Sequence, residues 1–157
     1  MMEAFRNQKI LVVGGAGFVG SNLVHRLLQS NPQEIIIVDN LLSAERINVP
    51  QETNVTFIEG SITDDRILDG LPGDIDYVFH LATYHGNQSS MHDPLADHEN
   101  NTFSTLKLYE KIKDFTGIKK VVYSSAGCTV AEKTFDHAEA TTEDAPVSLY
   151  LDSPYQI

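Results

Sequence analysis

The sequence predicts a doubly wound parallel α/β fold, with helices on both faces of one sheet in three αβα layers. Short apolar runs recur along the chain and have the length and composition of strands buried on both faces. Helical patterns separate these runs, and this alternation implies crossover connections between parallel strands. The first run leads into a glycine-rich turn that opens a helix. With 157 residues, the chain has the size of one domain.

Five apolar runs are the expected strands. They cover residues 10–13, 35–38, 55–58, 77–81 and 120–124. A helix is expected over 18–29, where apolar residues recur at helical spacing. These residues are Val19, Leu23, Leu27 and Leu28.

A long helix is expected between the fourth and fifth strands. Asp93 can cap it, Pro94 suits its first turn, and Gly117 ends it. The apolar residues along it recur every third position, at Phe103, Leu106, Tyr109 and Ile112.

Three glycines with regular spacing, Gly14, Gly17 and Gly20, follow the first strand directly. In a dinucleotide site, the first such glycine permits a tight turn and the second lets the backbone approach a pyrophosphate. The third lets the helix pack close to the strand. The helix N-terminus then offers N–H groups to the phosphates. A flexible turn with small residues packed under a helix is the plainer alternative.

Asp39 ends the second strand, about 20 residues after the glycines, where a carboxylate accepts hydrogen bonds from the adenosine ribose. Its position strengthens the dinucleotide interpretation. A 2′-phosphate at about 4 Å from this carboxylate would cost a few kcal/mol. No arginine follows Asp39 immediately, and Arg46 is the first one after it. The expected cofactor is therefore NAD rather than NADP.

The composition excludes several classes of partner. Eleven Lys and Arg against 22 Asp and Glu give a net charge of −11, which disfavours nucleic acids and anionic membranes. The apolar stretches are too short to cross a bilayer, and no apolar segment precedes Lys9 as a secretory signal would. The one cysteine, Cys128, fits a reducing compartment. The expected location is the cytoplasm.

No metal site is expected. The four histidines between residues 80 and 98 are scattered over a strand, a loop and a helix start, and none forms a pair with ligand spacing. They are His80, His85, His92 and His98. We interpret His80 as a strand residue and His85 as part of a cofactor or sugar cleft. Nothing around Cys128 indicates the lowered pKa that a nucleophile needs.

The motifs together resemble the extended short-chain dehydrogenase/reductase family, and within it the NAD-dependent epimerase/dehydratase group that acts on nucleotide sugars. The matching segments are 14–23, 38–41, 60–64, 78–82, 93–94, 101–105, 121–125 and 153–155. The resemblance implies a Rossmann-type NAD-binding domain over 1–157. It also implies that the chain stops near the start of the helix that carries the family's YxxxK motif, so that the C-terminal substrate-binding part is missing. Segments 82–88 and 126–133 look like a subgroup from bacterial surface-polysaccharide pathways.

The resemblance also implies a set of cofactor-binding residues beyond the glycines and Asp39. The complete expected set is Gly14, Gly17, Phe18, Val19, Gly20, Asp39, Asn40, Leu41, Ser61, Ile62, Leu81, Ala82, Thr83, Asn101 and Ser124.

The implied chemistry is redox at a sugar carbon, with Tyr155 taking the hydroxyl proton. The family usually carries Ser or Thr where this chain has Ala126, so that Ser124, Ser125 and Thr129 remain as candidates. Ser125 or Thr129 is the expected hydroxyl partner if the loop at Gly127 and Cys128 is shifted, and a hydroxyl that only satisfies the strand end is the alternative. Dehydratases of the group have an Asp-Glu pair where Gly127 and Cys128 stand, so a 4-epimerase is favoured.

A non-catalytic NAD-binding module is the alternative to an enzyme, because the family's lysine would fall at position 159, beyond Ile157. The expected partners are a nucleotide-sugar substrate and, in the longer protein, a second copy in a homodimer.

Overall fold

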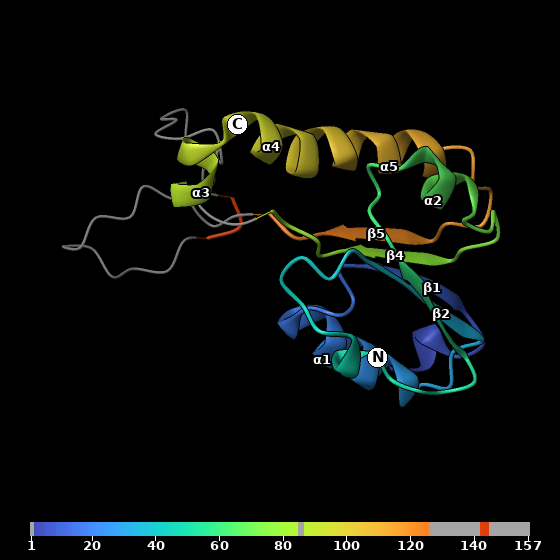
Figure 1. The fold of residues 1–157 in the computed structure, drawn as a ribbon. Coiled ribbons are helices and arrows are strands. Elements are labelled where there is room, and N and C mark those ends of the chain that lie inside the picture. Colours follow the sequence, from blue (N-terminus) through green and yellow to red (C-terminus); the bar gives the residue numbers. More distant parts are fainter. Residues whose placement is uncertain (1, 85–86, 126–141, 145–157) are drawn as a thin grey trace.

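The structure, a computed structural model, describes residues 2–84, 87–125 and 142–144. Its centre is a parallel five-stranded sheet with the order β3-β2-β1-β4-β5 (Figure 1). The strands are β1 (Lys9–Val13), β2 (Glu34–Asp39), β3 (Val55–Glu59), β4 (Tyr77–His80) and β5 (Lys120–Tyr123). Both ends of each strand lie within about one residue of the ends of the apolar run that predicts it. The predicted doubly wound fold is confirmed, and its strand order is that of dinucleotide-binding domains.

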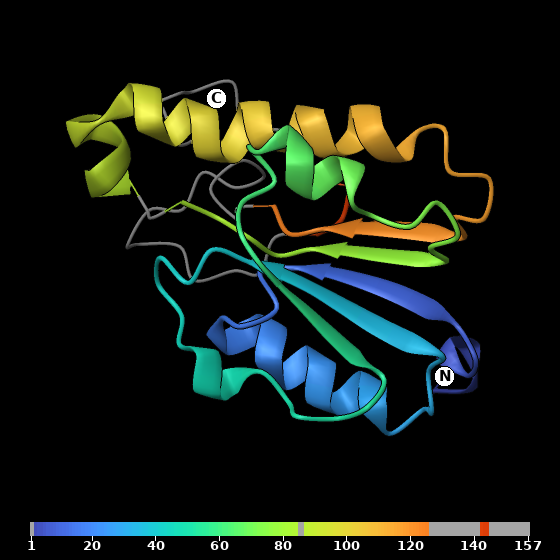
Figure 2. The same ribbon diagram turned by 45° about the vertical axis from the view of Figure 1, so that its right-hand side comes forward.

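Helices cover both faces of the sheet (Figure 2). The α-helices are α1 (Phe18–Leu28), α2 (Asp65–Asp69), α3 (Asn87–His92), α4 (Pro94–His98) and α5 (Ser104–Ile112). Short 3₁₀ turns are η1 (Met2–Phe5) and η2 (Arg46–Asn48). Helix α1 lies on one face, and α2 and the α4–α5 helix lie on the other. No helix in the described ranges combines the length and the apolar character that a membrane span requires.

The two central strands are buried on both faces, as their continuous apolar runs predict. Side chains alternate across the sheet, so Leu11 and Ile36 join α2 and α5 in one apolar cluster. Ile10 and Ile35 join α1 in the other. In open sheets covered by helices on both faces, ligands bind at the carboxyl edge, where the strands end.

The long helix begins as predicted, with the Asp93 carboxylate accepting from Ala96 N–H and Pro94 in its first turn. A π-helical stretch, η3 (Glu99–Phe103), joins α4 to α5. The buried side of α5 consists of Ser104, Leu108 and Ile112. Phe103 and Leu106, which belong to the three-residue pattern, stay 50% and 59% exposed. The pattern therefore predicts the helix but does not mark its buried side.

Candidate functional site

A cleft of about 270 Å³ opens at the carboxyl edge of the sheet. Strand order reverses there, because the chain proceeds from β1 outward through β2 and β3 and then returns to β4 on the other side of β1. Ligands of open α/β sheets bind at this switch point. The lining comes from the loops after β1, β2, β3 and β4.

The turn after β1 needs glycine at two positions. Gly14 has a φ of +82°, and a Cβ there would lie 2.6 Å from Ala82 N in the loop after β4. A Cβ at Gly20 would lie 2.1 Å from Gly14 O, because the first turn of α1 packs directly on the loop. Gly15 is a third tight position, with Ile37 Cγ2 2.7 Å from its ideal Cβ. Packing within the protein therefore accounts for glycine at these positions, as the plainer interpretation of the loop also expects.

Gly17 differs from its neighbours because the protein itself does not require it to be glycine. Among the described residues, an ideal Cβ there meets only Gly14 O, at 3.4 Å, which is close to ordinary contact. Gly17 is the N-cap of α1 and lines the cleft, and within the described part of the chain no side chain caps the N-terminus of this helix. The first helical bond runs from Ser21 N–H to Gly17 O, so the N–H groups of Phe18 and Val19 precede it. Uncapped N–H groups beside an open glycine form a cradle that fits an anionic diphosphate.

Asp39 lies at the end of β2 beside this cradle, and the residue is 9% exposed. Its Oδ2 accepts from Ala16 N–H at 2.9 Å, and its Oδ1 accepts from Leu41 N–H at 2.9 Å. An ionised carboxylate has about four lone-pair sites. Asp39 can therefore accept from a ligand hydroxyl and still hold the backbone on both sides.

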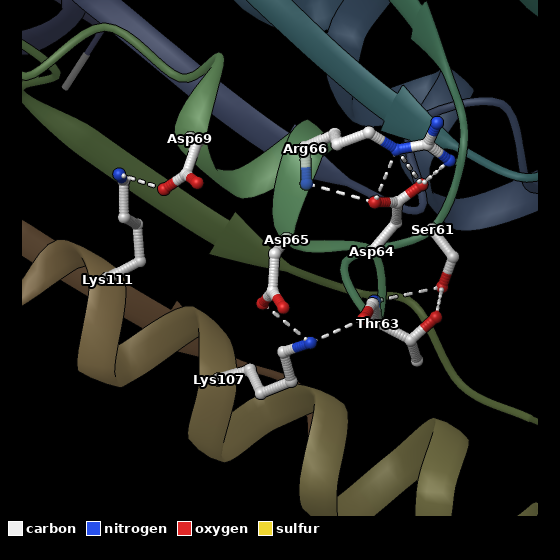
Figure 3. A network of polar contacts seen from close by, with 8 residues as sticks. All are labelled: Ser61, Thr63, Asp64, Asp65, Arg66, Asp69, Lys107 and Lys111. Carbon is white, nitrogen blue, oxygen red and sulfur yellow. Dashed lines mark hydrogen bonds and ion pairs between the residues drawn. The ribbon is translucent and has the colours of Figure 1, made fainter.

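The segment after β3 forms another wall of the cleft, through Ser61 and Ile62. Ser61 Oγ accepts from Thr63 N–H at 3.2 Å and from Thr63 Oγ1 at 3.0 Å. Lys107 of α5 donates to Thr63 O and pairs with Asp65 Oδ1 at 2.8 Å (Figure 3). Surface ion pairs contribute little stability. Here they tie the wall to the long helix.

A buried polar cluster supports the wall after β4. His80 is 2% exposed, and its Nε2 lies 2.9 Å from Thr105 Oγ1. Burial lowers the pKa of His80 to about 4, so its ring is neutral at pH 7. Asn101 Oδ1 accepts from Tyr84 N–H at 2.7 Å, and Asn101 Nδ2 donates to Asp97 Oδ1 at 2.9 Å. Burial raises the pKa of Asp97.

Most of the expected cofactor-binding residues line the cleft. They are Gly14, Gly17, Phe18, Val19, Gly20, Asp39, Asn40, Ser61, Ile62, Leu81, Ala82 and Thr83. Leu41 instead packs against the core cluster beside α1, with a φ of +57°. Asn101 binds the backbone of Tyr84, and Ser124 N–H donates to His80 O at the end of β5.

The catalytic residues expected from the resemblance are only partly described. Ser125 follows β5 and is exposed. Tyr155 and Thr129 lie outside the described residues, as do His85, Ala126 and Cys128. The described part of the chain contains no group of His, Cys, Asp and Glu that could hold a metal ion.

Several lining residues are absent from the sequence prediction. Leu42, Ser43 and Ala44 close the cleft beside Asp39, and Tyr84 and Asn100 close the opposite side. Leu41, with its positive φ, comes directly before Leu42, Ser43 and Ala44, which line the cleft. Adjacency to the motif residues was the only signal in the sequence.

The NAD dependent epimerase/dehydratase family matches the chain over residues 10–157. The chain belongs to this family. A UDP-glucose 4-epimerase of Streptococcus mutans is 33% identical over 147 residues, which are 92% of this chain and 43% of the relative. The chain thus spans less than half the length of this relative.

Solved structures of epimerase-family proteins have the same fold. The Bordetella bronchiseptica enzyme WbmF in complex with NAD+ is 59% identical with a TM-score of 0.82, and the match covers 98% of this chain and 42% of that one. An epimerase from Methanothermobacter thermautotrophicus is 38% identical with a TM-score of 0.87, over 99% of this chain and 45% of its own. The family, the Rossmann-type fold and NAD as the family's cofactor are thereby confirmed.

Proposed function

We propose that residues 1–157 are the NAD-binding domain of an oxidoreductase that works on nucleotide sugars, with 4-epimerase chemistry. The open cradle at Gly17 carries the proposal, because it lies at the switch point beside the Asp39 carboxylate. UDP-glucose 4-epimerases recur among the relatives, and one solved relative holds NAD+ and UDP. Another relative is a dTDP-D-glucose 4,6-dehydratase, but Gly127 and Cys128 stand where dehydratases have their acid pair.

When bound, NAD would supply the hydride acceptor for a sugar carbon. The chain's own residues then bind and orient it. The N–H groups of Phe18 and Val19 donate to diphosphate oxygens, and Asp39 accepts from the adenosine ribose hydroxyls. The loop after β4, with Leu81, Ala82 and Thr83, forms the wall of the cleft that lies across the glycine turn from Asp39.

We propose Tyr155 as the base for the sugar hydroxyl and Ser125 or Thr129 as its hydroxyl partner. A free tyrosine has a pKa of about 10, so a tyrosine base at neutral pH requires a neighbouring positive charge. Proton removal from the hydroxyl and hydride departure from the same carbon leave a ketone, so that atoms and charge balance.

The second candidate, a non-catalytic NAD-binding module, is favoured by Ala126, since this position usually carries the family's catalytic hydroxyl. An assay of the chain, and of any longer form of it, with UDP- and dTDP-linked sugars separates the two. Turnover of any of these sugars supports the enzyme. NAD binding without turnover in every form supports the module.

Exchange of Asp39 for alanine tests the cofactor proposal. The wild-type chain is expected to bind NAD more tightly than NADP in a titration. In Asp39→Ala, NAD affinity falls because the ribose contacts and the hydrogen bond that holds Ala16 N–H are both lost. The preference for NAD over NADP falls by at least about tenfold because the charge that repels a 2′-phosphate is gone.

Glu59→Ala is the matched control for Asp39→Ala. Glu59 ends the neighbouring strand in register with Asp39, and it pairs with Arg46 on the surface. The control removes one negative charge nearby and is expected to leave the NAD preference unchanged. An equal change in both variants would mean that long-range charge, and not ribose contact, sets the preference. A wild-type chain that binds neither cofactor would overturn the proposed function.

We further propose a homodimer and a cytoplasmic location, in a pathway that supplies sugars for surface polysaccharide. The long helix leaves an apolar side exposed that supports the homodimer, with Leu95 81% exposed in addition to Phe103 and Leu106.

A further inference from the structure

Two side chains from distant parts of the sequence hold Ala16, in the middle of the glycine turn. Asp39 Oδ2 accepts from Ala16 N–H at 2.9 Å. Asn48 Nδ2 donates to Ala16 O, also at 2.9 Å, from 32 residues further along the chain. Ala16 itself is fully buried. Both polar groups of this residue are therefore fixed from outside the turn.

The carbonyl that Asn48 holds belongs to the peptide plane between Ala16 and Gly17. The N–H of the same plane donates to Gly14 O at 3.3 Å. A peptide unit is planar, so two bonds at its opposite ends fix its orientation. The orientation of this peptide in turn sets the direction in which the next two N–H groups, those of Phe18 and Val19, point at the start of α1.

A turn rich in glycine needs such external support. Glycine has the widest range of backbone conformations, and ordering it costs more entropy than ordering any other residue. Gly14, Gly15 and Gly17 surround Ala16, so local side chains cannot define the turn. Hydrogen bonds from rigid neighbours can define it.

Asn48 lies on such a neighbour. It ends the 3₁₀ turn η2, where its N–H donates to Glu45 O at 3.0 Å. The next residue, Val49, is 7% exposed and belongs to the same apolar cluster as Ala16. The side chain of Asn48 therefore approaches the glycine turn from a backbone that is anchored in the core.

We infer that Asn48 is a positioning residue for the diphosphate part of the cofactor, and this inference rests on the proposed NAD-binding function. Asn48 does not line the cleft and acts through the Ala16–Gly17 peptide. Its loss should weaken ligands that carry a diphosphate and should spare ligands that carry none.

The experiment measures the Kd of NAD, ADP and adenosine for the wild-type chain and for Asn48→Ala and Asn48→Asp. In Asn48→Ala, we expect the Kd of NAD and ADP to rise about tenfold, the effect of one lost hydrogen bond. Adenosine, which has no phosphate, keeps its wild-type Kd. Asn48→Asp preserves the size of the side chain but sets a carboxylate against the Ala16 carbonyl, so its loss for ADP is at least as large.

Asn54→Ala is the matched control. Asn54 Nδ2 donates to Pro32 O at 3.1 Å, a partly buried bond of the same type at the amino edge of the sheet, away from the cleft. The control should lose similar thermal stability and bind all three ligands as the wild type does. If Asn48→Ala does not fold, Asn48→Asp is compared with Asn54→Ala in the same way.

Wild-type affinity for ADP in both Asn48 variants, or equal losses for adenosine and ADP, would overturn the inference and leave Asn48 a structural residue. Failure of the wild-type chain to bind NAD is a different result, because it overturns the proposed function first and this inference with it.

Discussion

Gly17→Val is expected to raise the Kd of NAD by roughly 100-fold, about the effect of one strong hydrogen bond lost to a charged ligand. Its free energy of unfolding should change by no more than about 1 kcal/mol. The valine side chain would point into the open space where the diphosphate is proposed to lie. Isothermal titration with NAD, together with a urea unfolding curve, measures both quantities.

The fold should tolerate this change because the structure places little against Gly17. Its φ of −67° and ψ of 172° are extended backbone, which valine adopts readily. The nearest atom to an ideal Cβ, Gly14 O, is 3.4 Å away. The remaining cost is that valine is a poorer N-cap residue than glycine.

Gly20→Ala is the control, because this change is expected to disturb the fold itself and not only the space for the ligand. Its Cβ would lie 2.1 Å from Gly14 O and 2.7 Å from Gly15 Cα, so the backbone of the turn must move. This variant is expected to lose stability and cofactor binding together. If Gly17→Val unfolds as readily as Gly20→Ala, or binds NAD with wild-type affinity, the cradle at Gly17 does not hold the diphosphate.

The glycine turn shows how far local sequence predicts a site. The spacing after a strand identifies Gly14, Gly17 and Gly20, because the requirements for these three glycines arise within the turn and the helix that follows it. It does not identify Gly15, whose constraint comes from Ile37 on the neighbouring strand. Nor does it identify Asn48, because a hydrogen bond over 32 residues leaves no trace in a local pattern.

The long helix shows the same limit, because the sequence pattern predicts where the helix begins but not which of its sides is buried. The cap at Asp93 and the proline after it predict where the helix starts, because these are local features. Residues three apart on a helix are about 60° short of a full turn, so Phe103 and Ile112 lie about half a turn apart. They therefore could not share one buried side, and Ile112 is buried while Phe103 is exposed.

Acidification from pH 6.5 to pH 4 is expected to remove about 3 kcal/mol of the free energy of unfolding through the titration of His80. This figure is the contribution of His80 and does not include other groups. Burial lowers the pKa of His80 from 6.5 to about 4. Above pH 6.5, the ring is neutral in both the folded and the unfolded chain, and its contribution to stability is complete. Between these pH values only the unfolded chain binds the proton, so the free energy of unfolding falls by about 1.4 kcal/mol per pH unit.

The surroundings of His80 explain why the folded protein rejects the proton. Its Nδ1 is buried and has no hydrogen-bond partner within the described residues, so a proton there would be an unpaired buried donor. Tyr123 packs edge-on against the ring at 5.4 Å, which offers no countercharge. Nε2 can remain bonded to Thr105 Oγ1 in the neutral form.

Urea unfolding of the wild type and of His80→Gln, at several pH values from 7.5 to 4.5, measures this effect. Glutamine can still bond to Thr105 but does not titrate, so the slope assigned to His80 should vanish in the variant. Asp97 has a raised pKa, so the folded chain binds its proton first and gains stability on acidification, opposite in sign to His80. Because Asp97 is present in both proteins, the difference between their curves isolates His80. Parallel curves over this range would mean that the folded protein accepts the proton at His80 as readily as the unfolded chain does.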